Sequence, residues 1–321
     1  MRGRFSGLFV SLSFLVAAIG VVLCRQQLVD WWQLHNYTPP TEVKQLADQG
    51  QVTDYARRVF YVTHPAVEDS NTFNQHCNQN AERTIVLGCY NGRYTYIYNV
   101  TDTRLDGVKQ VTAMHEMLHA AYDRLSSGDK AKINGQLEAQ LASLHDNHIN
   151  ELVLQYQKSE PGELDNELHS ILATEVSSLS PELETYYSKY FTNRKVVVQF
   201  ANQYESVFTD SQRQIETADA KLASLKAEIT DNQKSLEQEQ RDLQAESARM
   251  NTLRQADDIE AYNAAVGPYN TRVSEYNAKI AATKELVAEY NDLVERRNQL
   301  ATAHNDLAKS LNSNVTPLPA Q

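Results

Sequence analysis

Two histidines four residues apart are the part of this sequence best suited to chemistry. They are His115 and His119, in the segment His115-Glu116-Met117-Leu118-His119. On an α-helix this spacing places both imidazoles on one face, about one turn apart, so that both can reach the same ion. Glu116 lies between them and is placed to take a proton from a water that the ion activates. The pattern predicts a zinc site with two histidine ligands and Glu116 as general base.

A simpler interpretation is an amphipathic helix that carries two histidines by chance. Both histidines lie on or beside an apolar stripe, whose members are Val108, Val111, Leu118, Tyr122 and Leu125. Burying two imidazoles and a carboxylate there would be costly unless they shared a partner. This cost favours the zinc site.

A catalytic zinc ion normally takes three protein ligands and leaves one position open for water. The best candidate for the third ligand is Glu167, in the segment Asn166-Glu167-Leu168-His169-Ser170. The alternative is Glu175, because it lies two turns later near the centre of an apolar stripe, where an apolar residue is expected. The remaining histidines of this region are assigned to the surface or to packing: His145, His148 and His169.

The two segments together resemble the motifs of the gluzincin metallopeptidases, the thermolysin-like enzymes in particular. That family pairs HExxH with a glutamate in an NExxSD-type motif. The resemblance implies that His115, His119 and Glu167 bind Zn²⁺ and that Glu116 acts as general base and acid in peptide hydrolysis. It also implies a compact core with a small sheet whose edge strand binds an extended peptide. The final aspartate of the family motif is Ile171 here, so the carboxylate that would orient a ligand histidine is missing at that place.

The elements around this helix predict a small α+β domain over residues 41–202. Residues 83–90 and 93–100 are rich in β-forming side chains and are joined by Asn91-Gly92, which predicts an antiparallel hairpin. Residues 59–62 predict a further strand, and the region is otherwise mainly helical.

The last third of the chain carries a heptad repeat. Apolar residues recur every seven positions in two runs, first Ile215, Leu222, Ile229, Leu236, Leu243 and Met250, then Val266, Val273, Ile280, Val287 and Val294. Sustained heptads with charged residues between them predict a coiled coil over residues 203–311. Two arms of similar length suggest an antiparallel helical hairpin, and a parallel dimer of one longer helix is the alternative. Residues 312–321 are predicted to be a disordered tail.

The N-terminus carries a membrane-targeting pattern. Arg2 and Arg4 precede an apolar run over residues 8–24, which with the residues just before it is about 20 residues long and could cross a bilayer as a helix. The arginines favour a cytoplasmic location for residues 1–7, with residues 25–40 as a linker on the other side. We therefore expect a signal anchor and a single-pass membrane protein, with a cleaved signal peptide as the alternative.

Cysteine usage and charge bear on the compartment and the partners. Cys77 and Cys89 remain as a pair outside the apolar run and would form a disulfide in an oxidising compartment. The net charge of -11, without a basic stripe, argues against a nucleic-acid partner.

Two functions fit these patterns. The first is a membrane-anchored zinc metalloendopeptidase that acts outside the cytoplasm on a peptide or protein substrate. The second is an envelope scaffold or adaptor whose coiled coil binds a protein partner or a second copy of the chain, with an inactive or structural metal domain. The intact Glu116 favours the first, because a structural site needs no general base.

Overall fold

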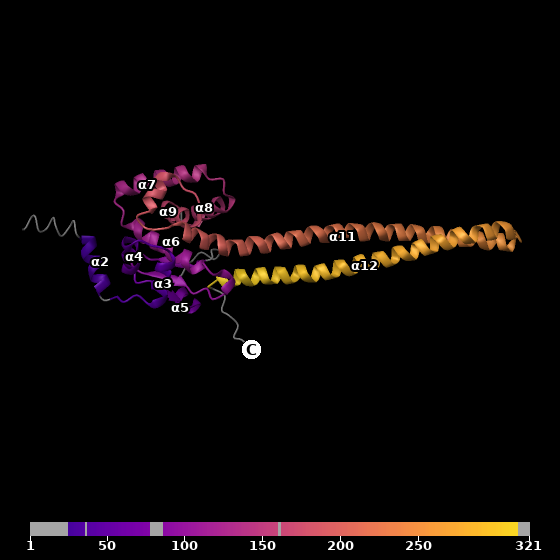
Figure 1. Cartoon of the computed structure of the whole chain (residues 1–321), viewed down its shortest axis with the longest axis horizontal. Coiled ribbons are helices and arrows are strands. Elements are labelled where there is room, and N and C mark those ends of the chain that lie inside the picture. Colours follow the sequence, from indigo (N-terminus) through magenta and orange to yellow (C-terminus); the bar gives the residue numbers. More distant parts are fainter. Residues whose placement is uncertain (1–24, 36, 78–85, 160–161, 314–321) are drawn as a thin grey trace, which may run out of the picture. The chain divides into compact units, whose positions relative to one another are not determined.

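The computed structural model describes residues 25–35, 37–77, 86–159 and 162–313. The chain divides into two compact units, one formed by residues 1–207 with 307–321 and the other by residues 208–306. The described part of the chain is 78% helical, and its three short strands form one sheet. The expected α+β class is therefore wrong, because strands make up so little of this mainly helical protein (Figure 1).

The sheet has the strand order β1-β3-β2, with β1 at Ala66–Glu68, β2 at Gly88–Tyr90 and β3 at Thr95–Tyr98. β2 and β3 are antiparallel, and Gly92 between them has a positive φ of 84°, a conformation that glycine adopts readily. β1 pairs with β3 in the parallel direction, so the sheet is mixed. β2 is one of its two edges.

Residues 59–62 were expected to form a strand and instead end helix α4 (Asp54–Val62). Thr53 caps this helix, because its side-chain oxygen accepts a hydrogen bond from the backbone N–H of Ala56. The apolar residues of α4 are buried at helical spacing, namely Ala56, Val59, Phe60 and Val62. Packing against a neighbouring helix has thus overridden the β preference of these side chains.

Helix α6 (Val108–Asp123) carries both histidines and the glutamate of the HExxH segment, and it lies at the centre of the first unit. It packs against α9 (Leu164–Glu175), against α3 (Thr41–Gln49) and α4, and against β2 and β3. The other helices of this unit are α2 (Arg25–His35), α5 (Ser70–His76), η1 (Thr103–Leu105), α7 (Ser127–Ser143), α8 (Asn147–Ser159) and α10 (Pro181–Tyr187).

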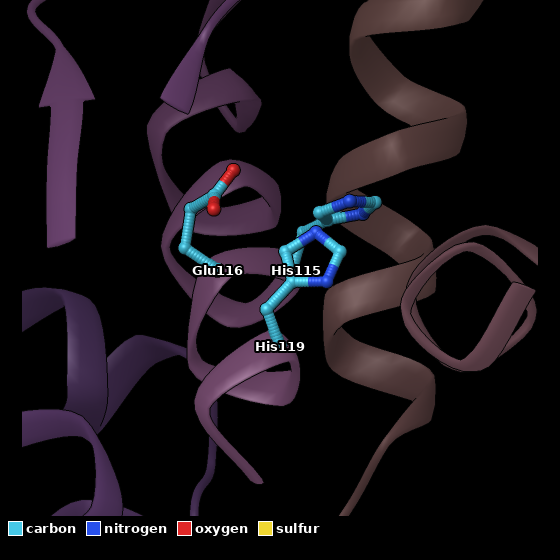
Figure 2. A group of neighbouring side chains, drawn as sticks. All are labelled: His115, Glu116 and His119. Carbon is cyan, nitrogen blue, oxygen red and sulfur yellow. The ribbon is translucent and has the colours of Figure 1, made fainter. Parts of the chain in front are cut away.

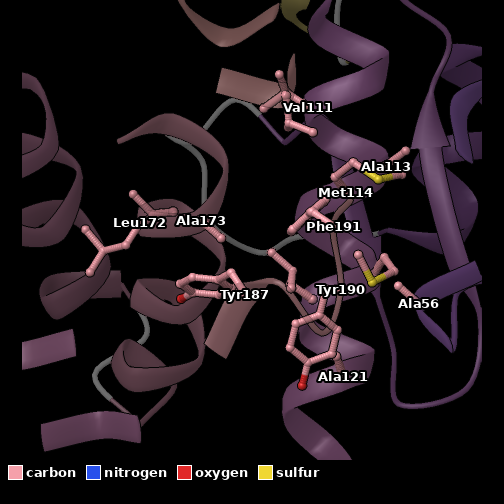
Figure 3. Packing of buried hydrophobic residues seen from close by; sticks show 14 of the residues in the cluster. Ala56, Val111, Ala113, Met114, Ala121, Leu172, Ala173, Tyr187, Tyr190 and Phe191 are labelled. Carbon is pink, nitrogen blue, oxygen red and sulfur yellow. The ribbon is translucent and has the colours of Figure 1, made fainter. Parts of the chain in front are cut away.

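The core around α6 combines small and large side chains. Ala113 and Ala121 are fully buried on α6, which lets neighbouring elements approach its backbone closely. Tyr190 and Phe191 belong to the same buried cluster, which Figure 3 shows from close by. The helix that carries the HExxH segment is thus enclosed by packed side chains along most of its length.

Residues 208–306 form the second unit from the long helices α11 (Lys195–Gln255) and α12 (Ile259–Leu311) (Figure 1). Ion pairs join the two arms, as between Asp219 and Arg297 at 2.8 Å and between Glu239 and Lys279. A residue later in α11 pairs with a residue earlier in α12, so the two helices run antiparallel within one chain.

The end of α12 returns to the first unit. Leu307 and Leu311 are buried, and Asn74 donates its side-chain N–H to the carbonyl of Ser313 at 2.8 Å. The first residues of the predicted disordered tail thus have defined positions, while residues 314–321 lie outside the described part of the chain.

Cys77, which follows α5, and Cys89, in β2, form a disulfide with their Cα atoms 5.9 Å apart. The bond connects the edge strand of the sheet to the neighbouring helix.

The predicted single-pass membrane topology requires correction. Over the residues that the structure describes, every helix is either too short or too polar to cross a membrane. The apolar run 8–24, on which the topology and the localisation were based, lies outside those residues.

Candidate metal centre

Helices α6 and α9 bring together the residues that the sequence singles out. His115 Nε2 lies 3.3 Å from Glu167 Oε2, and His119 Nε2 lies 3.5 Å from Glu167 Oε1. The two imidazole rings are 4.7 Å apart between centroids. Figure 2 shows them side by side, with the Glu116 carboxylate on another side of the same helix. The third candidate ligand thus meets both histidines although it lies about 50 residues later in the sequence.

The burial of this group is unusual for ionisable side chains. The side chains of His115, His119 and Glu167 are 14%, 10% and 11% exposed. Burial raises the pKa of Glu167, but the hydrogen bond and the charge of His115, with the charge of His119, outweigh it and bring the pKa below its ordinary value. The carboxylate is therefore ionised and suited to bind a cation.

The donor set fits a zinc ion. Zinc prefers imidazole nitrogen and carboxylate oxygen, and bonds of about 2.0–2.1 Å place the donors of a tetrahedral site roughly 3.3 Å apart. Each imidazole lies near this distance from one oxygen of Glu167, His115 Nε2 from Oε2 and His119 Nε2 from Oε1. Oε2 of Glu167 is buried, and its hydrogen bond with His115 Nε2, at 3.3 Å, has poor geometry. An ion between the three side chains would satisfy it.

The orientation of His119 is fixed by Asn166, a residue that the sequence analysis did not single out. Nδ1 of His119 lies 3.0 Å from Oδ1 of Asn166, and Ser170 Oγ lies 3.4 Å from the same nitrogen. An amide oxygen only accepts, so this hydrogen bond requires a proton on Nδ1 and leaves Nε2 as the ring nitrogen that faces Glu167. Asn166 thus orients this imidazole in a chain that has isoleucine at position 171.

Glu116 is held against the edge strand. The backbone N–H of Tyr90 donates to its carboxylate, and Gly88 packs so closely that an added Cβ would lie 2.8 Å from Oε1. Burial raises the pKa of Glu116 to about 7. One donor atom each of His115, Glu116 and His119 lie within 4.8 Å of one another. Glu167 contacts both imidazoles while β2 holds Glu116 aside, so Glu167 is the better candidate for a third ligand.

The structure places the alternative ligand, Glu175, elsewhere. It lies two turns beyond Glu167 on α9, next to His148 and Glu205. A further residue absent from the sequence analysis, Tyr156 of α8, places its hydroxyl against the Glu167 carboxylate. Burial, together with the charge of Glu167, raises the pKa of Tyr156 above its usual range, so it remains a donor. No local sequence pattern marks Tyr156, since its position depends on the packing of α8.

His169 has a packing role, as the sequence analysis assigned. It is fully buried, and its Nε2 lies 2.9 Å from the hydroxyl of Tyr186. Its ring also packs against Tyr122, Tyr187 and Tyr190. Burial lowers the pKa of His169 to about 3, and the charges of His119 and His115 act in the same direction.

No protein-family model, curated protein or solved structure matches this chain. The resemblance to gluzincins therefore depends on the two motifs and on the geometry of these side chains alone.

Proposed function

We propose that this protein is a zinc-dependent metalloendopeptidase. The observation that carries the proposal is the convergence of His115, His119 and Glu167 from two helices, with a buried Glu116 beside them. A structural zinc site would use four ligands and would need no carboxylate with a raised pKa at its side.

The residues divide into ligands and a proton carrier. His115, His119 and Glu167 would hold the ion, which when bound would polarise the scissile carbonyl and activate water. Glu116 would take a proton from the attacking water and pass it to the leaving amine. A pKa raised toward neutrality by burial suits a group that must both accept and release a proton near pH 7.

The substrate would be an extended segment of a peptide or protein. β2 is an edge of the sheet, and Glu116 lies against its residues Gly88 and Tyr90. A peptide added along this edge by backbone hydrogen bonds would have its own backbone next to Glu116. Such binding requires an unfolded or flexible segment, because a folded one has already paired its backbone.

The substitution Glu116→Gln tests the proposal. It keeps the shape of the side chain but removes the proton carrier, so zinc content should stay at the wild-type value while hydrolysis of an unfolded protein falls by roughly 10²–10⁴-fold. The matched control is Glu138→Gln, at an exposed position of α7, which should leave both unchanged. Wild-type hydrolysis by pure Glu116→Gln protein would contradict the proposal.

A second function, protein binding by the helical hairpin, is favoured by one observation. Residues 208–306 form a compact unit of their own, and every residue of the candidate metal centre belongs to the other unit. Replacing residues 208–306 by a flexible linker of about eight residues tests this division, because neighbouring helices are only 8–10 Å apart. Retained hydrolysis with loss of a partner, or of self-association, would assign the hairpin to binding.

A further inference from the structure

A second cluster of metal-ligating side chains lies outside the centre described above. It consists of His148 on α8, Glu175 at the end of α9 and Glu205 in the first part of α11, all in the first unit. His148 Nε2 lies 3.4 Å from Glu205 Oε1 and 3.8 Å from Glu175 Oε2. One donor atom of each residue lies within 4.8 Å of the others. Three helices thus contribute one donor each to one place.

An ordinary surface ion pair between His148 and Glu205 does not explain why the buried Glu175 lies beside them. The side chain of Glu175 is only 12% exposed, whereas that of His148 is 54% exposed. An ion pair between His148 and Glu205 would need neither a buried carboxylate beneath it nor a second negative charge. Burial raises the pKa of Glu175 to about 7, which shows how poorly its surroundings solvate the charge.

The charge and the donor types fit a divalent cation. The two carboxylates offer a divalent cation two negative charges once Glu175 has released its proton. Imidazole nitrogen with carboxylate oxygens is a common ligand set for zinc and similar ions. The separations of 3.4 and 3.8 Å would need to change by only a few tenths of an ångström to reach the roughly 3.3 Å of a tetrahedral site. The exposed face of His148 leaves room for a water as fourth ligand.

We propose that His148, Glu175 and Glu205 bind a second divalent cation, of the type of Zn²⁺. This site shares no residue with the first, and Glu175 follows Glu167 by eight residues, about 12 Å along α9, although the charge of His115 also acts on Glu175. The ion would connect α8 and the beginning of α11 to the helix that carries Glu167. Binding would therefore stabilise the arrangement of these helices, by an amount that grows with the logarithm of the free-ion concentration above the Kd.

The test is the zinc stoichiometry of the full chain, measured by elemental analysis after the metal-free protein has been loaded with Zn²⁺ and dialysed. The wild type should hold two ions, and His148→Ala and His119→Ala should hold one each. The double variant should hold none. His145→Ala is the matched control, since this exposed histidine precedes α8 and lies outside the cluster, and it should hold two.

Glu205→Gln is a second variant, which removes a partly exposed ligand from a long helix and so leaves the fold intact. It should also hold one ion. Zinc should slow amide hydrogen exchange in α8 of the wild type but not of His148→Ala. A wild type with a single ion, lost in His119→Ala and kept in His148→Ala, would overturn this site and leave the proposed peptidase intact. Two ions retained in both His148→Ala and Glu205→Gln would overturn it as well.

Discussion

His119 donates from Nδ1 to Oδ1 of Asn166 across 3.0 Å, and this contact directs its Nε2 toward Glu167. The two partners lie on different helices, so the packing of α6 on α9 sets the orientation of the imidazole as well as its position. Partners of this kind raise the affinity of a ligand histidine by fixing its tautomer before the ion arrives.

Replacing Asn166 by alanine should therefore weaken zinc binding at the first site by about 10–100-fold, while the fold is retained. Asn166→Asp should keep the affinity, because a carboxylate accepts the same hydrogen bond. Competition with a chelator of known affinity measures both, in a His148→Ala background that leaves only the first site. Asn150→Ala, at an exposed position of α8, is the control. Unchanged affinity in Asn166→Ala would show that packing alone orients His119.

Gly88→Ala should lower hydrolysis without removing zinc. The added Cβ would lie 2.5 Å from Thr112 Cγ2 and 2.8 Å from Glu116 Oε1, so the glutamate must move away from β2. We expect kcat to fall by at least about 10-fold, since displacement of a general base removes much of its contribution. Gly135→Ala in α7, where nothing lies within 4 Å of the new Cβ, is the control. Full activity with bound zinc in Gly88→Ala would mean that Glu116 need not touch the strand.

His169 should make the zinc-free protein sensitive to acid. Burial lowers its pKa to about 3, so the fold favours the neutral ring. Above the ordinary pKa of about 6.5, both the folded and the unfolded protein keep this ring neutral, and the free energy of unfolding does not depend on it. As the pH falls toward 3 the unfolded chain takes up a proton that the fold excludes, and the free energy of unfolding is lower by about 3 kcal/mol at pH 4.5. His169→Phe should remove this loss, at a cost of about 1 kcal/mol at pH 7.5 for the hydrogen bond to Tyr186.

Urea unfolding at pH 7.5 and 4.5 measures the difference. The exposed His145→Gln should behave as the wild type at both values. An equal loss of stability in wild type and His169→Phe would mean that other groups cause the acid sensitivity.

Arg194→Met should destabilise the first unit by about 3–5 kcal/mol. The guanidinium is 3% exposed and donates to the backbone carbonyls of Ala173 and Val176 at the end of α9, at 3.0 and 2.6 Å. Methionine fills similar space but leaves those acceptors unpaired. Urea unfolding measures the change, and Glu184→Gln, which weakens only the ion pair of Arg194, should cost less. An equal loss of stability in Arg194→Met and Glu184→Gln would show that Arg194 stabilises the fold through its ion pair rather than through the carbonyl groups.

The sequence identified those parts of the protein that depend on spacing along one helix. The interval from His115 to His119 places both rings on one face of α6 whatever surrounds it, and the heptads of α11 and α12 mark a continuous apolar seam in the same way. Glu167 was found because a second short motif marks it, and the structure places it against both histidines.

Features that depend on contacts between distant segments were missed or misread. Residues 59–62 are β-branched and aromatic, so their local preference is for a strand. They form part of a helix because they are buried where α4 packs against α6. Tyr156 and the cluster of His148, Glu175 and Glu205 come from separate helices, so no pattern within one segment reveals them. Asn166 stood in the second motif, but its role depends on where α6 places His119.

The return of α12 to the first unit makes the hairpin an insertion with two points of attachment, rather than a C-terminal appendage. A protease that cuts the tip near Asp257 would therefore release neither arm, because each fragment keeps its own end packed in the first unit. Two separately expressed polypeptides divided at that tip should for the same reason reassemble by complementation. Likewise, matched deletions of seven residues in each arm would shorten the hairpin while preserving its seam.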